Sequence, residues 1–186
     1  MARTHAFCNK IKEHTMHSKK IVWLWVITLA YCISQASYAS IIVPMTLVSM
    51  NNNGKRVGSV KLDDTLYGLL LTPTLHSIPA GIHGWQIHTL PFCSNYAKAA
   101  GGHLDINNAN VHLGPYNGHG HIGDLPVLIV QHNGKAALPV VAPRLKLRDI
   151  VGRTLVINVG GDNYSDSPEV NGGGIRALAC GIIPYH

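Results

Sequence analysis

Three histidines and one aspartate lie in one glycine-rich segment of the chain, GGHLDINNANVHLGPYNGHGHIGDLP, at residues 101–126. Zn²⁺ binds four ligands in tetrahedral geometry, and imidazole nitrogens and carboxylate oxygens suit it well. Glycines allow a loop to turn its own side chains inward, because they adopt backbone conformations closed to other residues. A histidine-rich surface loop without an ion is the alternative, but it would need no such glycine framing. The segment therefore predicts a zinc site with the ligands His103, His112, His121 and Asp124.

Short motifs occur in a set order in and around this segment. Within it they are GGH at 101–103, HLGP at 112–115 and GHIGDLP at 120–126. Outside it they are GIHGWQIH at 81–88, APRLK at 142–146, GRTLVINVGGDN at 152–163 and ACGII at 179–183. The series resembles bacterial copper,zinc superoxide dismutases over roughly residues 41–183. The resemblance implies an eight-stranded Greek-key β-barrel, which is an immunoglobulin-like sandwich, with long zinc and electrostatic loops.

The pattern of the chain after residue 40 is also typical of an all-β protein. Short apolar runs alternate with Gly, Asn and Pro turns, and no segment sustains a 3.6-residue period. Asn53-Gly54 and Asn133-Gly134 are turn signals typical of hairpins. The pattern alone does not distinguish a sandwich from a barrel, whereas the resemblance implies the barrel. The predicted strands cover residues 41–50, 57–62, 67–72, 84–88, 128–131, 136–141, 154–159 and 177–183.

Residues 1–39 have the features of a secretory signal peptide. Four lysines precede an apolar run at 21–33, and Ser37-Tyr38-Ala39 offers small residues where a signal peptidase reads. A membrane anchor is the competing interpretation, but the run has about thirteen residues where a spanning helix needs about twenty. A lipoprotein signal ending at Cys32 is a further alternative, which the bulky Tyr31 disfavours. We expect a signal peptide at 1–39 and one domain at 40–186, periplasmic or secreted, with no membrane attachment after cleavage.

The mature chain would be nearly neutral and would keep two cysteines. The whole chain has a formal charge of +6, but ten basic and eight acidic residues remain after cleavage at Ala39. No basic patch with interleaved aromatic residues indicates nucleic-acid binding. Cys8 and Cys32 leave with the leader, and the remaining Cys93 and Cys180 predict one disulfide in an exported chain. In the family, the matching pair ties the loop after the GIHGWQIH strand to the last strand.

The copper half of the site departs from the family pattern. Members hold copper with four histidines: two in an H-x-H strand, one that bridges to zinc, and one in a later strand. Side chains of a strand alternate between its faces, so residues 86 and 88 share a face, and here they are Gln86 and His88. Asn158 replaces the histidine of the later strand. Only His88 and the bridging His103 remain as a residual copper site, and amide oxygens are poor copper ligands.

Two residues match positions that support the metals in the family. His83 matches a structural histidine that braces the loop and binds no metal. Asp162 matches the carboxylate that links a copper-ligand histidine to a zinc-ligand histidine. With Gln86 on the copper side, the expected role of Asp162 is to accept the free N–H of His112 and fix its tautomer. A plain turn residue in GGDN is the alternative interpretation of Asp162.

The family's anion-guiding arginine would fall at Ala177, but Arg176 lies one residue earlier. In a regular strand this shift turns the guanidinium to the other face, unless a bulge at 172–174 restores it. Arg176 is therefore a possible, shifted catalytic residue. His119 lies close to the zinc ligands in sequence and could supply a substitute copper ligand.

These observations support three hypotheses about function. The first is an exported zinc-binding family member that has lost dismutation, because dismutation needs a metal that both accepts and donates an electron and Zn²⁺ is redox-inert. The second is an active copper,zinc superoxide dismutase with unusual copper ligation. The third is a Cu(I)-binding or delivery protein that uses His88 and His103. Zinc is the expected cofactor, and copper is doubtful. The sequence does not decide between a homodimer and an unknown protein partner.

Overall fold

The computed structural model describes residues 40–185, so the predicted signal peptide at 1–39 lies outside the described residues. Strands make up nearly all of the regular structure in this part. Their bounds are β1 Ile41–Leu47, β2 Arg56–Thr65, β3 Gly68–Leu75, β4 Gly81–His83, β5 Trp85–His88, β6 Leu128–Val130, β7 Val140–Ala142, β8 Thr154–Asn158 and β9 Ala177–Ile182. Three short helical turns lie in the connections: η1 Lys98–Ala100, α2 Leu147–Ile150 and η2 Val170–Gly173. No helix within residues 40–185 is long and apolar enough to cross a membrane.

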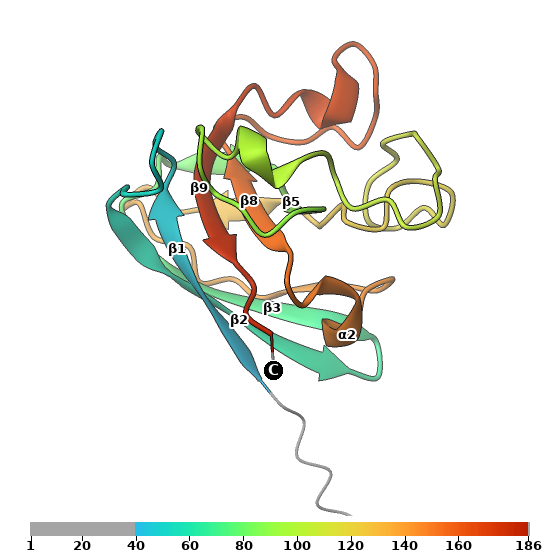
Figure 1. Ribbon diagram of the computed structural model, residues 1–186, viewed down its shortest axis with the longest axis horizontal. Helices are drawn as coiled ribbons and strands as arrows, with labels where there is room; N and C mark the ends of the chain where they lie inside the picture. Colours follow the sequence, from blue (N-terminus) through green and yellow to red (C-terminus); the bar gives the residue numbers. More distant parts are fainter. Residues whose placement is uncertain (1–39, 186) are drawn as a thin grey trace, which may run out of the picture. The chain divides into compact units, whose positions relative to one another are not determined.

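The strands pair antiparallel throughout. One sheet has the order β5-β8-β9-β1-β2-β3-β7, and β4 pairs separately with β6. β4 and β5 are two halves of one extended stretch divided at Gly84, so they join the two sheets. After β6 the chain turns at Gln131–Lys135 and reaches β3 through a bridge between Leu75 and Ala136. The sheet thus curls round on itself (Figure 1), which confirms the predicted all-β fold. The described residues contain nine strands, because β4 adds to the eight predicted segments.

Alternating side chains give the curled sheet one apolar face. In β1, Ile41, Val43 and Met45 are buried while the residues between them are exposed. They belong to one core cluster with the buried side chains of other strands. Trp85 of β5 is part of this cluster and is fully buried. Burying apolar surface between the two halves of the sheet is the main force that closes the barrel.

Two long loops follow neighbouring strands of the sheet and carry most of the predicted site residues. The first long loop (residues 89–127) joins β5 to β6, and the second long loop (159–176) joins β8 to β9. β5 and β8 are neighbours in the sheet, so both loops start from adjacent strands. Cys93 of the first loop is bonded to Cys180 of β9, with Cα atoms 5.8 Å apart. The predicted disulfide is therefore present and ties this loop to the sheet.

Candidate metal centre

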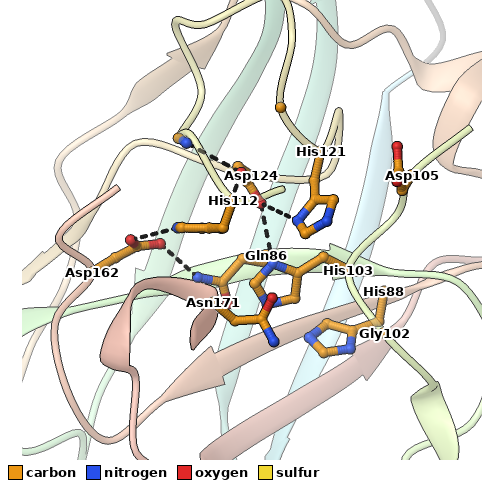
Figure 2. A network of polar contacts seen from close by, with 12 residues as sticks. Gln86, His88, Gly102, His103, Asp105, His112, His121, Asp124, Asp162 and Asn171 are labelled. Carbon is orange, nitrogen blue, oxygen red and sulfur yellow. Dashed lines mark hydrogen bonds and ion pairs between the residues drawn. The ribbon is translucent and has the colours of Figure 1, made fainter. Parts of the chain in front are cut away.

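The four residues predicted to bind zinc converge on one point. One ligand atom from each of the four lies within 4.8 Å of all the others. His103 Nδ1 is 3.1 Å from Asp124 Oδ1, His112 Nδ1 is 3.0 Å from Asp124 Oδ2, and His121 Nδ1 is 3.7 Å from Asp124 Oδ1. Bonds of about 2.0–2.2 Å to Zn²⁺ separate tetrahedral ligand atoms by about 3.3–3.6 Å, so the group has the right dimensions. Figure 2 shows the three imidazoles arranged around the Asp124 carboxylate.

Two buried nitrogens of this group have no hydrogen-bond partner, which is what a cation site requires. His112 Nδ1 and His121 Nδ1 are buried and make no hydrogen bond. Buried polar atoms without partners are rare in folded proteins, and each calls for an explanation such as an ion. A cation at the centre would accept both lone pairs and the carboxylate together. The donor set of three imidazoles and one carboxylate therefore fits zinc.

The charges of the group suit a cation as well. Burial opposes the charge of Asp124, yet its close contacts with the rings of His103 and His112 outweigh burial and lower the pKa of this carboxyl to about 2. Burial also opposes the charged form of His112, but its contacts with Asp124 and Asp162 raise the pKa of its ring to about 9 in the metal-free protein. The carboxylate is thus ionised at neutral pH, and a metal must displace a proton from His112.

Asp162, from the second long loop, orients His112. Its Oδ1 lies 2.8 Å from His112 Nε2 and also accepts the backbone N–H of Tyr164. An ionised carboxylate only accepts hydrogen bonds, so His112 carries its proton on Nε2 and presents a lone pair on Nδ1 to the metal position. This is the arrangement expected for Asp162 from the sequence.

Gln86 and Asn158, which the sequence predicts to be replaced copper ligands, are joined in a chain of hydrogen bonds to the same carboxylate. Gln86 Nε2 donates to Asp162 Oδ2 at 2.8 Å, and Asn158 Nδ2 donates to Gln86 Oε1 at 2.9 Å. Figure 2 shows dashed lines from the Asp162 carboxylate to His112 and to Gln86. Asp162 therefore keeps a partner on the copper side, which sequence reasoning missed because it assigned the residue only a zinc-side role.

His88 and His103, the two residues of the predicted residual copper site, lie close together. His88 Nδ1 lies 2.7 Å from the Gly101 carbonyl oxygen, and its buried Nε2 has no partner. The ring of His88 is 5.2 Å from that of His103, edge to face. Burial and the neighbouring His103 lower the pKa of His88 to about 4, so its ring is neutral at pH 7. The two imidazoles could hold one soft ion between them, but no third imidazole completes the group among the described residues.

A cavity of about 500 Å³ opens beside His88. Its wall includes Asn158 and the cations Lys98 and Arg176, with apolar side chains between them. Arg176 lies on this wall although it precedes Ala177. The pairing of β8 with β9 shifts register between Ile157 and Asn158, close to this residue.

Two other predicted residues lie outside the metal group. The ring nitrogens of His83 lie 2.7 Å from the Asn158 carbonyl oxygen and 2.8 Å from that of Pro79, so this side chain cross-links β4 to the end of β8. That placement agrees with a structural histidine. His119 is exposed and does not belong to the described lining of the cavity, so the structure does not bring it to the copper position.

Arg144 is a supporting residue that sequence reasoning did not single out. Its guanidinium donates to the backbone carbonyls of Pro115, Gly120 and His121 in the first long loop. One planar cation with several donors can satisfy several inward carbonyls at once, which a lysine cannot do with the same geometry. The APRLK motif contains this residue, but nothing in its spacing indicated which carbonyls it would bind.

Comparison with known proteins agrees with this geometry. The sequence profile of the family described as copper/zinc superoxide dismutase matches residues 56–183. The chain belongs to the copper/zinc superoxide dismutase family. A relative named superoxide dismutase [Cu-Zn] 2 from Salmonella typhimurium is 46% identical over 169 residues, which are 86% of this chain and 96% of the relative.

Solved structures of the superoxide dismutase family agree on the fold. The Cu/Zn superoxide dismutase from Brucella abortus is 42% identical, with a TM-score of 0.74, and the match covers 78% of this chain and 99% of that one. A double mutant of an SOD-like protein from Bacillus subtilis is 26% identical, with a TM-score of 0.66, and the match covers 77% of this chain and 97% of that one. The superoxide dismutase fold is therefore shared along nearly the whole described chain.

Proposed function

We propose that this protein is an exported, zinc-binding member of the superoxide dismutase family that no longer dismutates superoxide. The observation that carries the proposal is the contrast between the two halves of the site. In the zinc half, four ligand atoms converge and two buried nitrogens lack partners. In the copper half, two imidazoles remain, and the amides in place of the others are bonded to each other.

Zinc in this group would be a structural ion. It is redox-inert and would join the three histidines to Asp124, which lies at the end of the first long loop. Asp124 also accepts the backbone N–H of Gly114, so the ion would hold several turns of that loop together. Zinc and the Cys93–Cys180 disulfide would thus fasten the same loop at two points.

Copper lacks the ligands that its redox cycle needs. Cu(II) favours four nitrogen or oxygen ligands in tetragonal geometry, and imidazole is the preferred side chain for it. The amide nitrogen of Asn158 donates to the Gln86 oxygen, so that oxygen is already engaged. A copper ion here would have to break this bond and accept amide oxygens in place of imidazoles. The geometry therefore disfavours a Cu(II)/Cu(I) cycle.

A second candidate is Cu(I) binding by His88 and His103. The buried, unpartnered His88 Nε2 favours it, because two imidazoles suffice for a low-coordinate soft ion. Such a site would take up copper without catalysing dismutation. Export through the predicted leader at 1–39 would place either function in the periplasm or outside the cell, where the disulfide is stable.

The test measures metal content and superoxide disappearance in the same purified sample of mature protein. The protein is supplied with copper and zinc, and we expect one zinc per chain, little Cu(II) and negligible dismutation. The variant carrying both Gln86→His and Asn158→His rebuilds four imidazoles, so it should bind copper more tightly and gain activity. Each single variant should do less, because three imidazoles still leave the group incomplete.

Two results would decide against the proposal. One copper per chain with rates near those of an intact family member would mean that the amides complete a working site. Absence of zinc from protein prepared with excess zinc would mean that the four converging residues serve another purpose. Copper(I) uptake without dismutation would favour the second candidate.

A further inference from the structure

We propose that Gln86 and Asn158 are a matched pair that takes over the positioning of the zinc ligand His112, through Asp162. The inference rests on the proposed zinc-binding function and extends it. In the family pattern, Asp162 links a copper-ligand histidine to a zinc-ligand histidine. Here Gln86 supplies the donor on the copper side, so Asp162 stays held between two donors without any copper ligand at position 86.

The chemistry of the chain of bonds permits one arrangement only. Asp162 accepts and does not donate, so the Gln86 group that faces it must be the NH₂. The Gln86 oxygen then faces Asn158, which must in turn present its own NH₂. The observed bonds have these directions, with donor–acceptor distances of 2.8 and 2.9 Å. The amide orientations therefore follow from the carboxylate and do not depend on telling oxygen from nitrogen.

Burial makes each of these bonds matter. Gln86 has no exposed surface, and the side chains of Asp162 and His112 are 1% and 0% exposed. A buried carboxylate oxygen without a donor loses its hydration with nothing in return. An apolar side chain at position 86 would leave Asp162 Oδ2 in that state, and the carboxylate would be free to turn away from His112. Gln86 thus acts on the zinc group through Asp162 and is a positioning residue.

Glycines of the second long loop close over both ends of the chain of bonds. A Cβ at Gly172 would lie 2.1 Å from Asp162 Oδ1 and 2.8 Å from His112 Nε2. A Cβ at Gly174 would lie 2.6 Å from Asn158 Nδ2. The backbone therefore packs directly on the bonded atoms, which leaves no space for a side chain. This close cover keeps the chain of bonds in one arrangement.

The two amides also complement each other. Gln86 presents a buried carbonyl oxygen, and Asn158 supplies the donor for it. Gln86 in turn supplies the acceptor for the NH₂ of Asn158. Each amide therefore satisfies the other, and the pair forms a closed alternative to copper ligation.

The experiment compares zinc affinity in the mature protein, measured by competition with a chromophoric chelator. Gln86→Met keeps the length of the side chain but removes its donor, and it should weaken zinc binding about 10–100-fold, as loss of a group that orients a metal ligand does. Gln86→His restores a donor toward Asp162 and should stay close to the unmodified protein. Gln131→Met is the matched control, because Gln131 is exposed and lies outside the metal group.

A double-variant cycle tests the pairing. Asn158→Ala should weaken zinc binding less than Gln86→Met does, and the two together should be no worse than Gln86→Met alone, because both act through Gln86. Fully additive losses would overturn the relay. So would unchanged zinc affinity in Gln86→Met.

A second measurement uses the unmodified protein, so it tests the proposal even if Gln86→Met does not fold. In ¹⁵N-labelled, zinc-loaded protein, the side-chain amide protons of Gln86 should exchange with solvent far more slowly than those of Gln131. Equal exchange rates would overturn the proposal. The two proposals fail separately: an unmodified chain without zinc refutes the proposed function, whereas a zinc-loaded chain with a freely exchanging Gln86 amide refutes only the relay.

Discussion

Replacing Asp124 by asparagine isolates the part of the stability that comes from zinc. Asp124 is 1% exposed and is the one residue of the group that contacts all three histidines. Asparagine has the same shape and can still accept the Gly114 N–H, so the loop keeps that bond. The substitution removes the negative charge and one of four zinc ligands.

The expected loss of stability in Asp124→Asn has two parts. In the metal-free protein, close contacts with the rings of His103 and His112 hold the pKa of Asp124 at about 2, against 3.8 for the free side chain. A carboxyl group whose pKa is lower in the folded than in the unfolded protein stabilises the fold at pH values above its unfolded-state pKa. This contribution is lost as the pH falls through the folded-state pKa. At pH 7, removing the group therefore costs about 2 kcal/mol. With free zinc at a thousand times its dissociation constant, binding adds about 4 kcal/mol more. For a domain of this size each kcal/mol moves Tm by about 2–4 °C.

The assay is thermal unfolding at pH 7 with zinc and with excess chelator. Asp124→Asn should lower Tm by about 12–24 °C with zinc and by about 4–8 °C with chelator. Zinc content, measured on the same samples, should be lower in Asp124→Asn, in parallel with its lower Tm in the presence of zinc. Asp105→Asn is the control, because Asp105 caps backbone amides in the same loop but lies outside the metal group.

The two conditions make the reasoning refutable. An equal Tm difference with zinc and with chelator would mean that Asp124 acts only as a hydrogen-bond partner. Unchanged zinc content in Asp124→Asn would mean that the ligands are assigned wrongly. A large zinc-dependent loss in Asp105→Asn would point to a different ligand set.

Two further predictions concern the same loop. Cys93→Ser combined with Cys180→Ser should lower the free energy of unfolding by about 4–5 kcal/mol in a denaturant titration, since the bridge closes a loop of 87 residues; thiols that react in freshly exported protein would contradict the bridge. Arg144→Leu should cost about 2–4 kcal/mol and weaken zinc binding, because three loop carbonyls lose a charged donor. Arg148→Leu is the control, since its side chain is 85% exposed; equal effects of the two would refute a specific role for Arg144.

Features carried by local sequence were predictable. All eight predicted strands occur, with ends displaced by a few residues, because alternation of apolar side chains marks which residues face the core. The zinc group was predictable for a related reason. Its ligands lie within one glycine-rich loop, so their types and order were visible in a single stretch of sequence.

Other features of the fold escaped prediction because they depend on packing. The division of residues 81–88 into β4 and β5 arises where Gly84 passes from one sheet to the other, with Asp162 and Gln86 atoms 3.2 Å from the position of a Cβ. The three short helical turns carry no sustained period that a sequence pattern could reveal. The place of Arg176 beside the cavity and the register shift between β8 and β9 were both visible only in the structure.

The sequence by itself determined the chemistry of each position: three histidines and an aspartate whose types suit zinc, two amides where the family pattern has imidazoles, and a pair of cysteines. Only the tertiary structure decided what the amides do. Gln86, Asn158 and Asp162 lie on two strands and a loop, up to 76 residues apart, and no local pattern relates them. Hydrogen bonds depend on distances of about 3 Å and on direction, and those are set by the pairing of β5 with β8 and by the loop that closes over them.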